Sequence, residues 1–153
     1  MHRIAIHGTA WLTVALASTA CGLTDPDASS LDVQGHYSVW LAHRPAAYAF
    51  EVNRRCDCPD DVERPTWIRV EGDQPVEVRD VETGEALSTT GLRAITVDDI
   101  FIFLLEHMAK EASHLTVGFD VEHGFPTQAN GWVTGSLADE FTFTIVDFEP
   151  DDG

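Results

Sequence analysis

Two cysteines separated by a single residue form the part of this chain best suited to chemistry. Cys56 and Cys58 flank Asp57, and the third cysteine, Cys21, stands apart near the N-terminus. In an oxidising compartment such a pair is expected to form a disulfide. Chain entropy gives so small a ring only about 1.5 kcal/mol of stabilisation. We therefore predict a local clip at the end of a strand.

Disulfide exchange with a partner is the alternative role of the same pair. A bond between cysteines this close is strained unless the backbone bends, and a strained disulfide is reduced more easily. The negative charges of Asp57, Asp60 and Asp61 oppose a reactive thiolate. Arg54 and Arg55 partly offset that effect. The alternative therefore stays open beside the structural clip.

Patterns typical of enzymes and metal sites are missing from the sequence. It contains no Gly-x-Ser-x-Gly elbow, no phosphate-binding loop, and neither His-x-His nor His-Glu-x-x-His. We predict no catalytic residues, no metal and no cofactor. Three weaker alternatives remain: zinc on Cys56, Cys58 and one histidine; calcium on Asp147, Glu149 and Asp151; and acid–base chemistry at Asp120, Glu122 and His123.

The N-terminus has the pattern of an export signal. Arg3 precedes an apolar stretch over residues 4–17, which is shorter than the roughly 20 residues that span a bilayer. Residues 18–22, Ser-Thr-Ala-Cys-Gly, resemble a bacterial lipobox, with Ser18 where leucine is usual. We predict a signal peptide over residues 1–20 and acylation of Cys21. The alternative is ordinary cleavage and secretion with a free thiol.

Composition and charge predict the organisation of the rest. Residues 21–35 favour turns and suggest a flexible tether, residues 36–149 suit a single domain, and residues 150–153 form an acidic tail. Twenty-six acidic residues against nine basic ones give a net charge of −17. Such a field repels phosphate backbones, so nucleic acid is excluded as a partner. The expected partners are a membrane, reached through the lipid, and an unknown protein or small molecule.

Hydrophobic periodicity predicts the elements that position these residues. Two helices are expected, one over residues 36–44 and one beginning at Thr96. Alternating apolar residues predict strands near residues 48–53, 66–71, 76–79, 115–121 and 141–145, and residues 127–134 can return antiparallel after a turn at residues 122–126. We therefore predict an α+β fold. Its parts are one antiparallel sheet of about six strands, one long amphipathic helix packed on a face, and a short N-terminal helix.

The second helix has an apolar stripe that two large residues do not follow. Its stripe runs at helical spacing from Val97 to Ala112, whereas Ile102 and Phe103 fall beside it. Either the buried face is broad, or these two side chains meet the tether or a partner.

Several short motifs occur in an order that resembles a known family. They are Trp40, Tyr48-Ala49-Phe50, Cys56-Asp57-Cys58, a helix start at residues 96–101, and Phe119-Asp120 followed by Gly124-Phe125-Pro126. The set is similar to an uncharacterised family of small bacterial lipoprotein domains of unknown function. The chain departs from it at Phe119 and Phe125, where tyrosine is usual. The resemblance implies a lipoprotein domain and an α+β fold, and it implies no activity.

The sequence thus predicts an exported, lipid-anchored protein of the cell envelope, on the periplasmic or extracellular side. It would be secreted if Cys21 is not acylated. The expected function is a non-catalytic binding or inhibitory domain, with thiol–disulfide exchange as the alternative. An exposed aromatic patch around Tyr48, Phe125 and Trp132 is the predicted binding surface.

Overall fold

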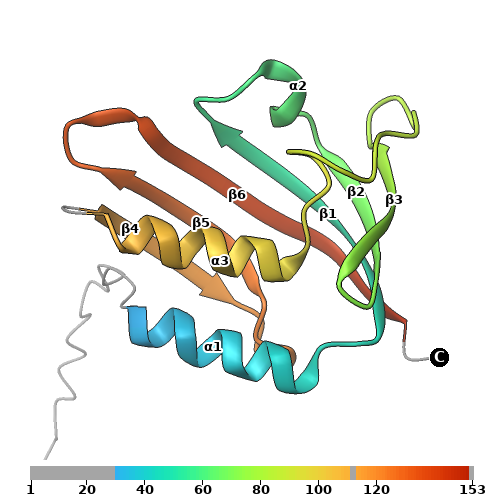
Figure 1. Ribbon diagram of the computed structural model, residues 1–153, viewed down its shortest axis with the longest axis horizontal. Helices are drawn as coiled ribbons and strands as arrows, with labels where there is room; N and C mark the ends of the chain where they lie inside the picture. Colours follow the sequence, from blue (N-terminus) through green and yellow to red (C-terminus); the bar gives the residue numbers. More distant parts are fainter. Residues whose placement is uncertain (1–29, 111–112, 152–153) are drawn as a thin grey trace, which may run out of the picture.

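A computed structural model describes residues 30–110 and 113–151 (Figure 1). The predicted signal peptide and Cys21 lie outside the described residues. The elements follow one another as α1 (Ser30–His43), β1 (Ala47–Cys56), α2 (Asp60–Glu63), β2 (Thr66–Glu71), β3 (Gln74–Asp80), α3 (Val97–Met108), β4 (Ser113–Phe119), β5 (Pro126–Val133) and β6 (Ser136–Asp151).

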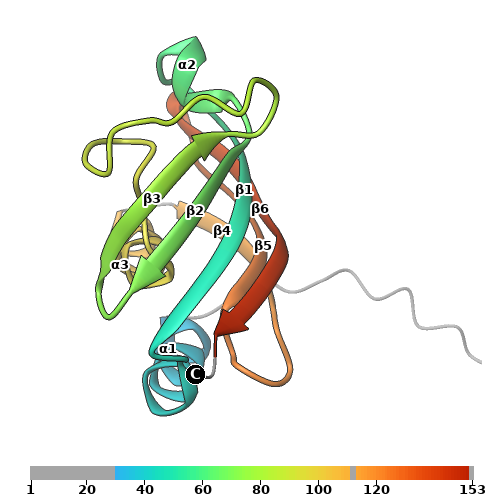
Figure 2. The ribbon, with the colours of Figure 1, turned by 90° about the vertical axis from the view of Figure 1, so that its right-hand side faces the viewer.

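The six strands form one sheet in the order β3-β2-β1-β6-β5-β4, and every neighbouring pair is antiparallel. The sheet is strongly twisted, as the view along it shows (Figure 2). The two central strands, β1 and β6, pair from Ala47↔Asp151 to Cys56↔Phe141. Side chains of β1 alternate between the two faces. Phe50 and Val52 are therefore buried, and Glu51 between them is partly exposed.

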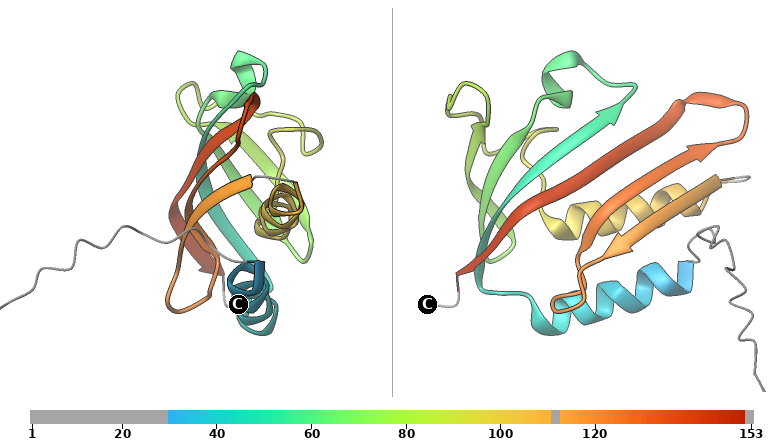
Figure 3. Two further views of the ribbon diagram at one scale, coloured as in Figure 1. Left: turned by 90° about the vertical axis from the view of Figure 1, so that its left-hand side faces the viewer. Right: turned by 180° about the vertical axis from the view of Figure 1, so that it is seen from behind.

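Helices α1 and α3 lie side by side on one side of the sheet (Figures 1 and 3). Helix α3 begins with a capping box, because the Thr96 hydroxyl accepts from the Asp99 amide and the Asp99 carboxylate accepts from the Thr96 amide. Its buried residues include Ile100, Phe101 and Leu104, which join the core. Within the part of the chain that the structure describes, no helix is long and apolar enough to cross a membrane.

The prediction of one long amphipathic helix packed on the sheet is wrong. Over residues 30–110 and 113–151 the structure has a six-stranded antiparallel sheet with three short helices, of 14, 4 and 12 residues, and the strands dominate the fold. Helix α3 is capped at Ala109, whose amide donates to the Leu105 carbonyl, before the chain enters β4. Its 12 residues span only about 18 Å, so the apolar stripe is too short to cover the sheet alone.

Two predicted boundaries also differ from the structure. Helix α1 begins at Ser30 rather than His36, so residues 30–35 of the expected tether are helical, and Val33 is fully buried. Burial of Val33 explains the earlier start, since an apolar contact with the core stabilises the added turn. At the other terminus β6 extends to Asp151, which includes the first half of the expected acidic tail.

One end of the core is filled by aromatic rings, and we call it the aromatic end. It consists of Trp40, Tyr48, Phe125 and Phe148. The ring centroids lie 5.3 Å apart for Trp40 and Tyr48, and 4.3 Å apart for Phe125 and Phe148. Tyr48 and Phe125 are 1% and 4% exposed. They are therefore core residues and not parts of an exposed patch, so the predicted binding surface is wrong in these two members.

The carboxylate of Asp98 in α3 forms hydrogen bonds with side chains in and just after α1, beside the aromatic end. Asp98 accepts hydrogen bonds from the Tyr37 hydroxyl at 3.3 Å, the Trp40 indole N–H at 3.2 Å and the Arg44 guanidinium at 3.1 Å. Arg44 also pairs with Asp73 in the β2–β3 turn. Each of these three donors thus has an acceptor, whereas the buried Nδ1 of His36, one turn before Trp40 on α1, has none among the described residues.

Candidate functional site

A hollow of about 480 Å³ opens at the other end of β1. It lies between the last residues of β1, the first part of β6, helix α3 and the loop that precedes α3. Its walls are largely apolar and include Leu92, Ile95, Ile100, Phe103, Phe141 and Phe143. The volume falls in the range of small-molecule sites, about 300–1,000 Å³. We call this hollow the pocket.

Apolar side chains stay exposed where the pocket meets the surface. Leu92 is 66% exposed and Phe103 is 45% exposed, and both line the pocket. Neighbouring Ile102 is 47% exposed. Ile102 and Phe103 are the two residues that did not follow the helical stripe, so the broad buried face is not the explanation for them. Large exposed apolar groups beside a concave site are typical of ligand-binding surfaces.

The guanidinium of Arg54 is the unusual polar group of the pocket. Its Nη1 donates to the carbonyl oxygen of Leu92 at 2.6 Å. Its Nε and Nη2 are buried, and among the described residues neither has a hydrogen-bond partner. Burial, followed by the nearby charge of Arg93, lowers the pKa of Arg54 to about 10. A buried cation with free donors is unfavourable unless an anion pairs with it.

The one carboxylate that lines the pocket is already engaged. Asp99 Oδ2 accepts from the Thr96 amide and from the Thr96 hydroxyl, both at 2.8 Å. These bonds cap α3 and hold Asp99 in place. Arg55 lines the pocket as well. In a chain with only nine basic residues against 26 acidic ones, the pocket therefore gathers positive charge.

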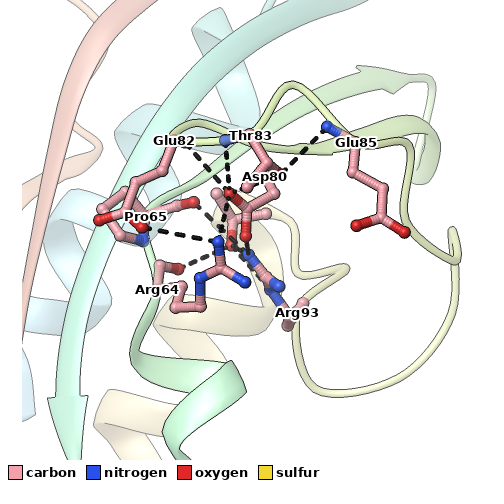
Figure 4. Close-up of polar contacts among 8 residues, drawn as sticks. Arg64, Pro65, Asp80, Glu82, Thr83, Glu85 and Arg93 are labelled. Carbon is pink, nitrogen blue, oxygen red and sulfur yellow. Dashed lines mark hydrogen bonds and ion pairs between the residues drawn. The ribbon is translucent and has the colours of Figure 1, made fainter.

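A buried carboxylate fixes the loop that walls the pocket (Figure 4). Asp80, 1% exposed, accepts from Arg93 Nη2 at 3.0 Å and from Arg64 Nη2 at 3.1 Å. It also accepts from the amides of Glu82 and Thr83. Burial alone would raise the pKa of Asp80, but the hydrogen bonds from Arg93 and Thr83 keep this pKa below its usual value.

The Asp80 contacts matter for the pocket because of what lies next to Arg93. Arg93 Nε also donates to the Thr66 hydroxyl at 3.1 Å, so its guanidinium is paired on both sides. The preceding residue, Leu92, provides the carbonyl that accepts from Arg54. The Asp80 contacts therefore hold the pocket wall, and with it the orientation of Arg54.

The predicted cysteine pair lies at the pocket. The structure joins Cys56 and Cys58 in a disulfide, with their Cα atoms 5.2 Å apart, and both residues line the pocket. Glu63 of α2 accepts a hydrogen bond from the Cys56 amide at 3.0 Å. The two sulfurs and a Glu63 carboxylate oxygen lie within 4.8 Å of one another. Sequence reasoning proposed a histidine as third ligand and missed this glutamate.

The other candidate residues are dispersed. Trp132 is 40% exposed and stacks on His114, away from Tyr48 and Phe125. Asp120 accepts from the amides of Glu122 and His123, which is the geometry of a turn. The carboxylates proposed for calcium lie along β6, where Asp151 pairs with Arg69.

Comparison with known proteins places the chain in a family. Residues 32–150 match the family described as "Family of unknown function (DUF6174)". The chain belongs to this family. The resemblance to a family of unknown function is thereby confirmed, while lipid attachment and bacterial origin stay predictions. No curated protein matches the chain, and no solved structure does.

Proposed function

We propose that this protein is exported, held in the cell envelope by a lipid on Cys21, and binds a small amphiphilic acid in the pocket without converting it. The anchoring part is supported by the apolar stretch over residues 4–17 and the lipobox-like residues 18–22. The binding part is supported by one observation above all. Arg54 has two buried donors without partners at a hollow whose walls are apolar.

The free edge of Arg54 suits a carboxylate. Nε and Nη2 carry parallel N–H bonds along one edge of a guanidinium, and a carboxylate accepts both at once. The other side of the group is held by the bond from Nη1 to Leu92. The guanidinium is thus oriented before a ligand arrives, which reduces the entropy lost on binding. Both free donors are covered in the ligand-free structure, so the side chains over them would have to shift for the acidic group to reach Arg54. The apolar body would contact Ile100, Phe103 and Phe143.

Electrostatics adds selectivity to this arrangement. The overall charge of −17 repels anions from the surface as a whole. At the pocket, Arg54 and Arg55 outnumber the one lining carboxylate among the described residues, Asp99, whereas the charge of nearby Arg93 is paired with Asp80. An anionic ligand is therefore favoured at this place, and its apolar part is favoured by the walls. Neither feature alone selects for a molecule that has both.

A fluorescent fatty acid tests the proposal. Dansylated undecanoic acid is titrated into the purified protein, and then displaced with medium-chain fatty acids or with the alcohols of equal chain length. We expect the acids to displace the probe and the alcohols to do so about 10–100-fold less well, because one or two charge-assisted hydrogen bonds are lost. Arg54→Met should weaken the acids by a similar factor. Equal binding of acids and alcohols would refute the proposal.

A matched variant separates the local effect from net charge. Arg79 is exposed on β3 and hydrogen-bonds to Glu77, and it does not line the pocket. Arg79→Met removes the same charge as Arg54→Met. It should leave displacement by the fatty acids unchanged. The anchoring part is tested apart from this, by incorporation of labelled palmitate, which Cys21→Ser should abolish.

Thiol–disulfide exchange is a second candidate, favoured by one observation. Both cysteines of the disulfide line the pocket, so a small thiol bound there could reach them. On this alternative Cys56→Ser would fold normally and lose exchange with a small thiol. As a structural clip, the same variant would lose only stability.

A further inference from the structure

We propose that Cys56, Cys58 and Glu63, once the disulfide is reduced, form a three-ligand site for a divalent metal of the zinc class. One ligand atom from each residue already lies within 4.8 Å of the other two, and all three residues are partly buried. In the structure the two sulfurs are bonded to each other. Once this bond is cleaved, the two thiolates can move apart and share one tetrahedral ion with the carboxylate, with bonds of about 2.3 Å and 2.0–2.2 Å. This proposal rests on the cluster alone and is independent of the proposed function.

The surroundings of Glu63 prepare its carboxylate for this role. Oε1 accepts from the Cys56 amide at 3.0 Å, which fixes the side chain next to the sulfurs and leaves Oε2 for a metal. Val62, the preceding residue of α2, is 6% exposed and attaches this short helix to the core. In the described part of the chain Glu63 forms no ion pair with a basic side chain. The carboxylate is therefore available.

The local charge fits a dication. Two thiolates and one carboxylate around a divalent ion leave a net charge of −1, and the neighbouring Arg54 and Arg55 can balance it. Three protein ligands leave the fourth tetrahedral position open. Because both cysteines line the pocket, that position can face it and accept water or an acidic group. Thiolate ligands select zinc, cobalt and iron over magnesium and calcium.

Reduction must come first, and its balance is simple. A dithiol donor gives two electrons and two protons to the Cys56–Cys58 bond, becomes a cyclic disulfide itself, and leaves two thiols. Metal binding then releases both thiol protons. The same site is thus a disulfide under oxidising conditions and a metal site under reducing ones. The metal and the disulfide exclude each other, because they use the same sulfurs.

Cobalt provides a direct test on the full chain carrying Cys21→Ser, in which only Cys56 and Cys58 supply thiols. The protein is reduced with a phosphine, kept free of oxygen and titrated with Co²⁺. We expect sulfur-to-cobalt charge-transfer bands in the near ultraviolet and the visible bands of a tetrahedral ion. They should reach a plateau at one ion per chain and disappear when Zn²⁺ is added. The oxidised protein should give none of them.

Two variants of α2 make the test specific. Glu63→Gln should weaken zinc binding at least about tenfold, since changes in even the outer shell cost 10–100-fold. Asp61→Asn removes the same charge from the same helix and should change the affinity less than twofold. Equal weakening by both variants would reduce the effect to general electrostatics and overturn the proposal.

Circular dichroism accompanies each titration. A reduced protein that keeps its sheet signal and gives no cobalt bands would overturn the proposal. So would a reduced protein that loses this signal and does not recover it with Zn²⁺. Recovery of the sheet signal together with the bands would support it.

Discussion

The two ends of β1 differ in how their buried polar groups are paired. At the aromatic end, Trp40 and Tyr48 fill the space, and Asp98 accepts the donors around it. At the other end a pocket of about 480 Å³ is left, and Arg54 keeps two buried donors without partners. Both ends belong to one sheet and one continuous core. The aromatic end is thus filled by rings, whereas the other end contains the pocket.

This contrast separates stability from binding. Satisfied polar contacts and filled volume stabilise the folded state, whereas a hollow with an unpaired cation lowers its stability. Real proteins keep such unfavourable places at functional sites. We therefore expect mutations at the aromatic end to change mainly the free energy of unfolding. Mutations at the pocket should change mainly ligand affinity.

Truncation of the central tryptophan should give the largest effect. Trp40→Ala removes a fully buried ring and one hydrogen bond to Asp98, and is expected to cost about 3–5 kcal/mol of unfolding free energy. Phe103→Ala, at the pocket, removes a ring that is already 45% exposed and should cost about 1 kcal/mol. Urea denaturation measures both. Equal losses would break the contrast between the two ends.

Removal of the buried charge at Asp80 should have a smaller effect that depends on pH. Its pKa in the folded protein lies below the usual value of 3.8, so its ionised form favours folding. That contribution is fully present above the usual value and is lost as the pH falls through the lowered one. The wild type should therefore lose more stability than Asp80→Asn between about pH 7 and about pH 3.

The Asp80 experiment gains a second measurement, the binding of the fatty acid probe, and a control variant, Glu85→Gln. Since Asp80 holds Arg93, and Leu92 beside it holds Arg54, Asp80→Asn should also weaken the fatty acid probe at neutral pH. Glu85→Gln changes a neighbouring exposed carboxylate that points away from Asp80 (Figure 4). Glu85→Gln should change neither the loss of stability with falling pH nor the binding of the fatty acid probe. A pH profile shared by the wild type and Asp80→Asn would show that Asp80 does not stabilise the loop.

Local patterns in the sequence predicted much of the sheet and little of the site. Alternating residues marked five of the strands, the turn after residue 121 marked the return strand β5, and Thr96 with Asp98 and Asp99 marked the start of α3. The length of a helix and the burial of a ring depend on partners distant in sequence. For that reason the extent of α3 was wrong, and Tyr48 and Phe125 were misplaced on the surface.

One signal for the pocket was nevertheless present in the sequence. Tyr48, Phe50 and Val52 alternate along β1, and the same alternation places Arg54 on the buried face. An arginine at an inward position needs either a partner or a ligand. Which of the two applies could not be read from the sequence, because the carbonyl that meets Arg54 belongs to Leu92, 38 residues away.

A glycine-to-alanine substitution can be compared at the two ends of β1, at Gly124 near the aromatic end and at Gly131 beside the pocket. Gly124 has a φ of 79°, and an added Cβ would lie 2.9 Å from Val39 and 3.2 Å from the His36 carbonyl. Neither the backbone nor this packing can yield, so Gly124→Ala should cost about 1–3 kcal/mol. At Gly131 an added Cβ would lie 2.6 Å from the ring of Phe141, which lines the pocket, and 3.1 Å from Nε2 of His107.

Gly131 has no positive φ, and we expect the Phe141 ring to shift toward the pocket, so Gly131→Ala should cost about 1 kcal/mol and reduce the volume of the pocket. The fatty acid probe should bind this variant more weakly, whereas Gly124→Ala should bind it normally wherever it is folded. Denaturation and probe titration on the same two samples measure both quantities. The reverse order of stabilities would mean that the pocket wall is as tightly packed as the aromatic end.

The smallest change in stability is expected at the most important residue for binding. Arg54→Met replaces a buried cation that has two unpaired donors with an apolar side chain of similar length. Such replacements are often neutral or stabilising, because no desolvated charge remains. The melting temperature of the ligand-free variant should equal or exceed that of the wild type, while the same concentration of fatty acid should raise it more in the wild type. A clear loss of stability in Arg54→Met would show that Arg54 is held for the fold, and the two ends of β1 would then differ in shape alone.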